Sequence, residues 1–385
     1  MLAAARPLSA ETVPIGRAGG RVSAEDARAR VDLPPFPSSA MDGFAVRAVD
    51  LPATLPIVGE SAAGRPFDGR LEPGSTAAIS TGAVVPEGAD CVVPIERVVV
   101  MDNSVEFSIE VDPGTNVRPR GGDIAAGEVA VPPGVRLTPA RIAAAAAVGI
   151  AELQCRRRPR VAVLATGSEL VAPGDGLRDG QIYESNTVML AAALAEAGAE
   201  VEAQAPSADD EVALREVLER GLAADVLVTS GGVSVGEHDL VRAVERELGV
   251  EEAFWRVSMK PGKPISFGTR GETLVFGLPG NPVSALVGCE LFVKPALRAL
   301  QGLADPAPRF EPGRLSVGLR RDAERDEFVR ARTQVDGDAV ILEPVMGQES
   351  HMIVRSSVAD ALVHVPRGNG ELAEGAIVRW LPLGA

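Results

Sequence analysis

Two lysines in the stretch MKPGKPISFG (259–268) are the first residues whose type and spacing suggest chemistry. Lys260 and Lys263 are two of only three lysines in a chain with thirty-five arginines. A lysine ammonium is a compact point charge that suits a small anion or a phosphate oxygen, whereas a guanidinium suits flat, bidentate partners. The pair either binds an anion or belongs to a solvated turn, and the rest of the chain has to distinguish these.

Four glycine-rich or charged loops follow predicted strands, and the lysine pair belongs to one of them. In open α/β sheets, ligands bind beyond the carboxyl ends of the strands. Glycines let backbone amides approach an anion, and helix starts offer free N–H groups. The loops read TGSEL (166–170), TSGGVSVGEHD (229–239), MKPGKP (259–264) and GLPGNPVSA (277–285).

Each of these loops also has an ordinary structural interpretation. The glycines alone are typical of turns, and Glu169 and Asp239 alone are typical of helix caps. As carboxylates near a phosphate they could instead hold Mg²⁺, which takes one or two carboxylates plus phosphate oxygens and water. No GxxxxGK[ST] and no GxGxxG in a strand–helix context occurs, which excludes a P-loop and a dinucleotide fingerprint. Four such loops at one edge favour a phosphorylated or oxyanionic ligand.

A second set of polar loops lies nearer the N-terminus. PPFPSSAMDGFAV (34–46) contains Asp42, and ISTGAVVPEGADCVVPIE (79–96) contains Thr81. NVRPRGGDI (116–124) reads equally well as a phosphate-binding turn or a solvated hairpin. Loops are where functional residues tend to collect. Because this set belongs to a different predicted domain, the domains must fold back, or a second subunit must contribute, for both sets to act together.

The elements that position these residues follow from the hydrophobic pattern. Strands alternate with helices over 157–305, which predicts a three-layer α/β domain with a mainly parallel sheet. Short β-like runs separated by Gly/Pro turns predict an inserted β domain at 31–130 and a C-terminal β domain at 310–385. The remaining segments, 1–30 and 131–156, are expected to form a helical linker domain. Ser23 is expected to cap a helix over SAEDARAR, and Pro139 to start another. Asn281 is expected to cap a third helix, with Pro282 in its first turn.

Composition limits the partners. The net charge of −15 opposes binding to nucleic acid or an anionic membrane, so an anion site has to be built locally. The three cysteines and three histidines have no metal-ligand spacing, and the cysteines are expected to be buried thiols of a reducing cytosol. The N-terminus lacks a signal-peptide pattern, and no segment has eighteen uninterrupted apolar residues. We therefore expect a soluble, cytoplasmic protein.

Taken together, the motifs resemble those of the MoeA family of molybdopterin molybdenumtransferases. SAMDGFA, STGAVVPEGADCVV, TGSEL, SGGVSVGEHD, KPGKP and GLPGNPVSA occur in the family's order, and the resemblance extends over nearly the whole chain. It implies a homodimer of four-domain subunits with a molybdopterin-binding-like α/β domain and a small C-terminal β-barrel-like domain. The cleft would lie between the α/β domain of one subunit and the inserted β domain of the other.

The resemblance also implies a reaction and its ligands. Adenylylated molybdopterin is cleaved in the presence of molybdate, AMP leaves, and the dithiolene binds molybdenum, with Mg²⁺ required for the nucleotide. Because an adenylyltransferase makes this substrate, the sequence leaves open whether such a partner docks. Carried over residue by residue, the catalytic set is Asp42, Thr81, Asp123, Glu169, Asp209 and Asp239. Glu169 and Asp239 are the expected metal ligands.

The resemblance assigns a further set to substrate binding. Arg256, Lys260 and Lys263 match a basic cluster, and Arg330 and Ser350 match positions linked to molybdate. The complete predicted set is Gly231, Gly232, Ser234, Gly236, Arg256, Lys260, Lys263, Pro279, Gly280, Asn281, Pro282, Arg330 and Ser350. The chain departs from the family in having Glu349, where glycine is usual, before Ser350. A carboxylate there would repel molybdate.

Three other functions fit parts of the pattern less well. A stand-alone adenylyltransferase would consist of the α/β domain alone, and this chain has domains on both sides of it. A scaffold derived from the same fold would show degraded loops, whereas the acids and lysines are all present. A nicotinamide oxidoreductase would need the glycine fingerprint that is missing. The sequence therefore favours the transferase.

Overall fold

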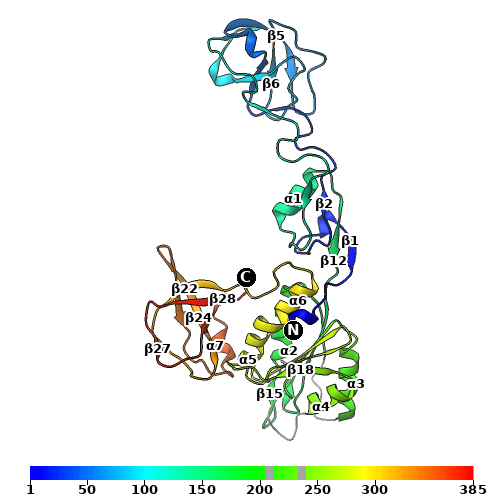
Figure 1. The fold of residues 1–385 in the computed structure, drawn as a ribbon, viewed down its shortest axis with the longest axis vertical. Coiled ribbons are helices and arrows are strands. Elements are labelled where there is room, and N and C mark those ends of the chain that lie inside the picture. The colour runs from blue at the N-terminus through cyan, green and yellow to red at the C-terminus, as the bar shows by residue number, and fades with distance from the viewer. Residues whose placement is uncertain (205–210, 233–239, 385) are drawn as a thin grey trace.

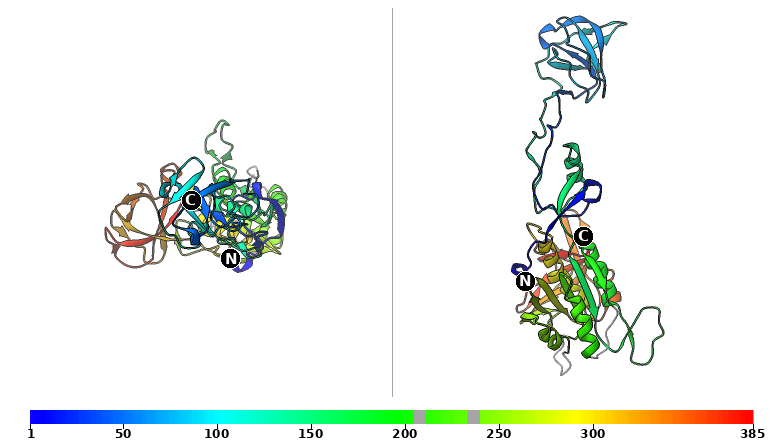
Figure 2. Two further views of the ribbon diagram at one scale, coloured as in Figure 1. Left: turned by 90° about the horizontal axis from the view of Figure 1, so that it is seen from above. Right: turned by 90° about the vertical axis from the view of Figure 1, so that its right-hand side faces the viewer.

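The computed structural model describes residues 1–204, 211–232 and 240–384. The molecule is elongated, with the inserted β domain at one end and the α/β and C-terminal domains side by side at the other (Figures 1 and 2). The linker region formed by residues 1–30 and 131–156, which we call the N-terminal segment, lies between them. Two stretches of chain connect the β domain to this segment, and they are bridged where Leu33 pairs with Ile124.

The helix expected over residues 23–30 does not form. This stretch contains β2 (Ala27–Arg28), which pairs with β11 (Val129–Val131). Ser23 is only 1 % exposed, and its hydroxyl donates to the Pro132 carbonyl at 2.6 Å rather than capping a helix. Val131 joins the buried cluster that this segment forms with residues 131–155. The prediction was wrong because this long-range packing outweighs local helix propensity.

One α-helix stands in this linker region, at the expected place. The helix α1 (Pro139–Ala147) begins with the predicted proline, and the hydroxyl of Thr138 accepts a hydrogen bond from the Arg141 amide. Ala145 is its buried residue. The other elements of the region are η1 (Leu2–Ala4), β1 (Ala10–Pro14), η2 (Ile15–Arg17) and β12 (Glu152–Arg156), with β1 antiparallel to β12.

The inserted β domain contains a six-stranded sheet in the order β7-β4-β6-β5-β9-β8. Its core includes Phe44 and Phe107, whose rings meet edge to face with centroids 6.3 Å apart. The strands are β4 (Gly43–Val46), β5 (Ala53–Ser61), β6 (Thr76–Ile79), β7 (Cys91–Pro94), β8 (Val99–Val100) and β9 (Ser104–Phe107). The turns η3 (Ala48–Asp50) and η4 (Ile95–Arg97) and the pair β3 (Ser38–Ser39) and β10 (Val117–Arg118) complete the domain.

The α/β domain has the predicted three layers around a sheet in the order β16-β13-β17-β21-β20-β18. Four strands are parallel, and β20 runs antiparallel to both of its neighbours. The strands are β13 (Arg160–Ala165), β16 (Glu200–Ala203), β17 (Val226–Ser230), β18 (Glu251–Trp255), β20 (Ser266–Arg270) and β21 (Thr273–Leu278). The small pair β14 (Leu170–Val171) and β15 (Ile182–Tyr183) follows β13.

Alternation along β13 divides the core between the two faces of this sheet. Val161 and Val163 pack with α2 and α5, whereas Ala162 and Leu164 pack with α3 and α4. The helices are α2 (Asn186–Glu196), α3 (Glu211–Gly221), α4 (Leu240–Glu247), α5 (Pro282–Gly288), η5 (Cys289–Val293) and α6 (Lys294–Leu300). Among the described residues, no helix is long and apolar enough to cross a membrane.

The C-terminal domain is a closed five-stranded barrel in the order β24-β25-β22-β28-β26, which closes because β24 also pairs with β26. One short strand from the α/β domain, β19 (Met259–Lys260), extends this sheet by pairing with β24. The remaining elements are β22 (Glu311–Leu315), β23 (Leu319–Arg320), β24 (Asp326–Asp336), β25 (Ala339–Pro344), α7 (Ile353–Ser356), β26 (Ala361–Val365), β27 (Glu371–Leu372) and β28 (Ile377–Pro382).

Candidate functional site

Five strands of the α/β sheet end at one edge, which we call the strand-end edge; β16, parallel to β13, is one of them. β13, β17 and β21 are parallel neighbours, and β18 runs in the same direction because β20 is antiparallel to both β18 and β21. All four loops singled out in the sequence therefore leave this edge, where open α/β sheets bind their ligands. In Figure 1 this edge lies near the label β15, on the side of the α/β domain that faces away from β5 and β6 of the inserted β domain.

Backbone contacts join three of these loops directly. The Thr166 amide donates to the Ser230 carbonyl and the Gly231 amide donates to the Leu278 carbonyl, each at 3.1 Å. Gly280 lies against Gly231, because a Cβ on Gly280 would be 3.6 Å from the Gly231 Cα. The chain thus brings together the loops that follow β13, β17 and β21.

The glycines after β17 are needed for this close approach. Gly231 has a φ of +95°, and a Cβ there would lie 2.7 Å from the carbonyl oxygen of Thr166. Gly232 has a φ of +65°, and its Cβ would lie 2.3 Å from a methyl carbon of Val241. Both positions combine a left-handed backbone with no room for a side chain, so only glycine fits without rearrangement.

Of the predicted acids of the α/β domain, Glu169 is the one that the structure describes. Its side chain is exposed, and its carboxylate folds back over Gly167, where a Cβ would lie 2.5 Å from Oε2. No group of three or more His, Cys, Asp or Glu side chains within 1–204, 211–232 and 240–384 is arranged to hold a metal. Four predicted residues lie outside those ranges: Asp209, Ser234, Gly236 and Asp239.

Two buried polar side chains at this edge were not anticipated from the sequence. The amide nitrogen of Asn186 donates to the hydroxyl of Ser230 at 2.9 Å and to the carbonyl of Gly280 at 2.7 Å. The only signal was a polar residue just ahead of the apolar run of α2, which is also typical of an ordinary cap. The two side chains reinforce the joining of the loops.

The loop with the two lysines leads from the strand-end edge into the C-terminal barrel. Lys260 lies in β19, and its ammonium pairs with the Glu327 carboxylate at 2.7 Å. Lys263 is exposed and has no ion pair within the described part of the chain. The two predicted anion ligands therefore differ, because Lys260 already has a carboxylate partner.

Arg256 precedes this loop in an unusual conformation. Its φ is +74°, and its guanidinium lies 3.9 Å from the ring centroid of Trp255. The guanidinium of Arg242 lies 4.0 Å from the centroid of the same ring. Cation–π stacking of this kind stabilises a guanidinium without a carboxylate. Arg256 is thus held at the end of β18 in a conformation that few non-glycine residues adopt.

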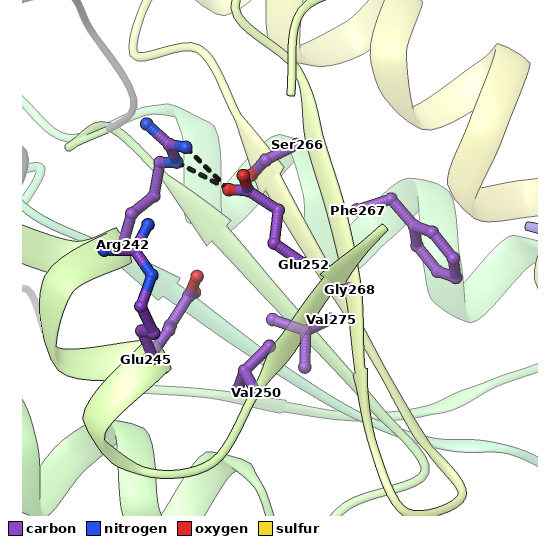
Figure 3. A pocket seen from close by; sticks show the side chains of 9 residues that line it. Arg242, Glu245, Val250, Glu252, Ser266, Phe267, Gly268 and Val275 are labelled. Atoms are coloured by element: carbon purple, nitrogen blue, oxygen red, sulfur yellow. Dashed lines mark hydrogen bonds and ion pairs between the residues drawn. The ribbon is translucent and has the colours of Figure 1, made fainter. Parts of the chain in front are cut away.

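A small cavity beside these residues has no room for a ligand of any size. It lies between α4 and strands β18, β20 and β21 and measures about 10 Å³, which is enough for one water molecule (Figure 3). Arg242 lines it and donates to the Glu252 carboxylate from Nε at 2.9 Å and from Nη2 at 2.7 Å. A nucleotide or pterin therefore does not fit in this cavity.

The loop after β21 is tied to the C-terminal domain. Asn281 occupies the N-cap position of α5, as expected, and Pro282 is the first helical residue. The Asn281 side chain makes no capping hydrogen bond to the helix; its amide donates to the hydroxyl of Ser350 at 3.0 Å. The amide of Val283 donates to the carbonyl of Ser350, also at 3.0 Å. Pro279, before this loop, is buried.

Arg330 is a buried cation behind Ser350. It is 1 % exposed and makes no salt bridge within the described residues; its Nη2 instead donates to the Gly347 carbonyl at 3.0 Å and the Glu349 carbonyl at 3.4 Å. Burial lowers the pKa of Arg330, and the charge of Glu349 partly opposes this change. The side chain of Glu349 is exposed. The loop is shaped instead by the hydrogen bonds that the guanidinium donates to backbone carbonyls and to a side-chain amide oxygen.

The predicted residues of the inserted β domain lie far from this edge. Asp42 and Thr81 are brought together, because the Thr81 amide donates to the Asp42 carboxylate at 2.6 Å. Asp123 is exposed beyond a turn in which Arg120 pairs with Asp32 at 2.5 Å. Figures 1 and 2 show that their domain and the α/β domain occupy opposite ends of the molecule.

Comparison with known proteins identifies the family of the whole chain. Three family models match in sequence: the MoeA N-terminal region (domains I and II) at 1–149, a probable molybdopterin binding domain at 162–299, and the MoeA C-terminal region (domain IV) at 312–383. A Mycobacterium tuberculosis protein named molybdopterin molybdenumtransferase 2 is 40 % identical, covering 97 % of this chain and 95 % of its own.

Two further relatives give the same result. The molybdopterin molybdenumtransferase of Haemophilus influenzae is 35 % identical, with 98 % of this chain and 94 % of the relative covered. The crystal structure of a molybdopterin biosynthesis MoeA protein from Pyrococcus horikoshii is 26 % identical and superposes with a TM-score of 0.85, covering 99 % of this chain and 97 % of that one. With near full-length identity of 35–40 % to two named transferases, the chain belongs to the MoeA family.

Proposed function

We propose that this protein inserts molybdenum into molybdopterin, cleaving adenylylated molybdopterin in the presence of molybdate to give the molybdenum cofactor and AMP. The observation that carries the proposal is the strand-end edge, where the loops after β13, β17 and β21 are joined and connected to the C-terminal barrel. The names of the full-length relatives support the same reaction. The chain would therefore act as a transferase.

The chemistry suits the residues at the edge. When a water oxygen attacks the adenylyl phosphorus, the bond from that phosphorus to the molybdopterin phosphate breaks, which gives AMP. Negative charge accumulates on the phosphoryl oxygens during this step, and positioned cations and amides stabilise it. No side-chain nucleophile is needed for this step. Glycine-lined loops such as that of Gly231 and Gly232 let backbone amides come close to phosphate oxygens. The sites of the pterin and the nucleotide would then lie along the strand-end edge.

Mg²⁺ fits this edge as a metal bound mainly by the substrate. Glu169 offers one exposed carboxylate above a glycine that leaves room for it, and Asp239 is the second ligand that we propose from the sequence. Magnesium commonly takes one or two carboxylates together with phosphate oxygens and water. Bound there, it would neutralise charge on the phosphates. Glu169 would orient the ion, and the amides of the neighbouring loops would orient the phosphates.

The molybdate subsite is proposed at the junction with the C-terminal barrel. Lys263 supplies an exposed cation, Ser350 a hydroxyl held by Asn281, and Arg330 a buried positive charge without a carboxylate partner among the described residues. A buried charge without a counter-ion is costly and favours an anion nearby. Lys260 could contribute one N–H while keeping Glu327 as its partner.

The proposed assembly is a cytoplasmic homodimer in which each site uses two copies. Asp42 and Thr81 lie in a domain at the opposite end of the elongated molecule from Glu169, which supports a contribution from a second subunit. In a two-fold dimer, the β domain of each copy would meet the strand-end edge of the other. The adenylylated substrate would come from an adenylyltransferase, which is the proposed partner in the reaction sequence.

The first test is AMP release from adenylylated molybdopterin and Mg²⁺, with and without molybdate. We expect molybdate-dependent release from the wild-type protein. Lys263→Ala should raise the molybdate concentration needed for half-maximal release by about tenfold, the effect of losing one charge-assisted hydrogen bond. Lys260→Ala should raise it less, because its ammonium is shared with Glu327.

Arg309→Ala is the control for the change in net charge. Arg309 is an exposed residue whose partner is Asp305, four residues away. We expect this variant to match the wild type. AMP release that does not depend on molybdate would contradict the transferase proposal. A Lys263→Ala response equal to that of Arg309→Ala would contradict only the assignment of the molybdate subsite.

A further inference from the structure

A buried amide at the start of α2 connects two loops of the strand-end edge. Asn186 is the first residue of α2 and is 9 % exposed. One nitrogen, Nδ2, reaches both loops: it donates to the Ser230 hydroxyl at 2.9 Å and to the Gly280 carbonyl at 2.7 Å. Since Nδ2 carries two hydrogens, these two bonds use its full donor capacity.

Ser230 extends the connection to the next carbonyl. Its hydroxyl accepts from Asn186 and donates to the Pro279 carbonyl at 3.3 Å. Two consecutive carbonyls of the loop after β21, those of Pro279 and Gly280, are therefore held from α2. This loop continues to Asn281, which contacts the C-terminal domain. One side chain thereby helps to hold a loop that contacts both the loop after β17 and the C-terminal domain.

The orientation of the amide is determined by its partners. If the amide were rotated by 180°, its oxygen would face the Gly280 carbonyl oxygen at hydrogen-bond distance, which is repulsive. In the observed orientation Oδ1 is buried and has no hydrogen-bond partner among residues 1–204, 211–232 and 240–384. Proteins rarely leave a buried polar atom unpaired, because doing so is costly. An apolar side chain would avoid that cost, but it could not hold the two carbonyls.

We propose that Asn186 is a positioning residue for the transfer reaction, acting by fixing the loop after β21 against the loop after β17. This inference rests on the proposed location of the substrate at the strand-end edge. Asn186 does not touch the reacting atoms. It holds the Gly231 and Gly280 loops at a spacing that the substrate phosphate requires, and a displacement of about 1 Å in such a loop can lower turnover about 100-fold.

A matched control is Gln301, which follows α6 and contacts the C-terminal end of α2. Gln301 is a buried amide, 5 % exposed, whose nitrogen donates to the Ala197 carbonyl at 3.0 Å and the Leu297 carbonyl at 3.1 Å. It holds the C-terminal end of α2, away from the strand-end edge. Gln301→Ala therefore removes the same kind of group, with the same number of bonds, without altering the site loops.

The test compares Asn186→Ala with Gln301→Ala in steady-state AMP release and in stability. We expect similar decreases in the urea midpoint for the two variants. Asn186→Ala should lower kcat by at least about tenfold with a smaller change in KM, because the loop geometry matters most in the transition state. Gln301→Ala should keep both constants within twofold of the wild type. Equal kinetic effects in the two variants would overturn the proposal.

A second variant and a measurement that is independent of activity complete the test. Ser230→Ala removes the bond to Pro279 and the bond from Asn186 to the Ser230 hydroxyl but keeps that from Asn186 to Gly280. It should lower kcat a few-fold, and it can be measured even if Asn186→Ala does not fold. Amide hydrogen exchange does not depend on activity: Asn186→Ala should accelerate exchange at the Gly231 and Val283 amides, and Gln301→Ala should not. If the wild type shows no molybdate-dependent release, the proposed function fails. Unchanged exchange in Asn186→Ala would instead overturn the positioning role.

Discussion

The strand-end edge and the polar loops of the inserted β domain both carry predicted site residues, but they are built differently. At the edge, buried side chains and backbone hydrogen bonds connect loops from three strands. Neither Asn186 nor Gly231 can move without breaking one of these contacts. In the β domain, Asp42 and Thr81 are exposed and bonded to each other, and Asp123 is exposed in a separate turn. One region is organised within the single chain, and the other presents its groups outward.

This difference indicates how the two regions divide the work. A preorganised edge keeps its dipoles fixed when charge develops, which is what electrostatic catalysis requires. Exposed acids on a distant domain gain a fixed position only when another surface covers them. The edge is thus organised when the single chain folds, whereas the β-domain residues would become fixed only in the proposed dimer.

The largest expected effect tests whether the regions meet across two subunits. Asp42→Asn and Glu169→Gln should each lower AMP release by about 100-fold, because each removes a charge close to the phosphoryl group. Co-expressed in equal amounts, the two variants should recover about one quarter of the wild-type activity. Half of the dimers are then mixed, and one of the two sites in each mixed dimer is intact.

The control for this experiment carries both substitutions in one chain. Mixed in equal amounts with the wild type, it should also leave about one quarter of the activity, since no mixed dimer has an intact site. Sites formed within a single chain predict about one half in this control and no recovery in the first mixture. That pair of results would refute the division of the site between two copies.

A smaller effect is expected from comparing one glycine in each region. Gly231 and Gly82 both have positive φ, +95° and +79°, but only Gly231 has an atom within 4 Å of an added Cβ. Gly82→Ala should cost about 1 kcal/mol of stability, for the backbone conformation alone. Gly231→Ala should cost about 3 kcal/mol and reduce kcat, because the Thr166 carbonyl has to move. Urea denaturation measures both, and equal costs would contradict the difference in packing.

The smallest effect concerns the buried thiols. Burial raises the pKa of Cys91 in the β domain to about 12, with the charge of Asp90 adding to it, and burial likewise raises that of Cys289 in the α/β domain to about 12. Because the thiol pKa is higher in the folded protein, each protonated thiol contributes to the stability of the fold. This contribution is complete below the ordinary pKa of 9.0 and declines as the pH rises from there toward 12. At pH 8 iodoacetamide should label neither thiol in the folded protein.

The labelling experiment also compares the two regions. If Cys91 reacts at pH 8 while Cys289 does not, the β domain opens locally more often than the α/β domain. Mass spectrometry after digestion identifies the labelled site, and a sample unfolded in urea gives the full extent of reaction. Rapid labelling of Cys289 in the native protein would contradict its burial.

Much of the fold was predictable because its elements are locally encoded. The apolar run before Gly167 and the proline at the start of α1 indicated the right elements, and alternating β and α segments indicated the layers. The helix over residues 23–30 was predicted wrongly, because local propensity contains no information about packing against 131–155. The capping role of Asn281 was correct in position and wrong in partner, since Ser350 lies sixty-nine residues away.

The candidate site divides in the same way. The sequence by itself determined the chemical groups available: glycines that admit phosphate, a scarce pair of lysines, and acids after strands. Only the tertiary structure decided which groups meet. It pairs Lys260 with Glu327 and leaves Lys263 exposed, joins the edge loops through Asn186, and keeps Asp42 at the other end of the chain. The physical reason is that side-chain type and local propensity act over a few residues, whereas charge pairing and buried hydrogen bonds depend on distances that only the folded chain sets.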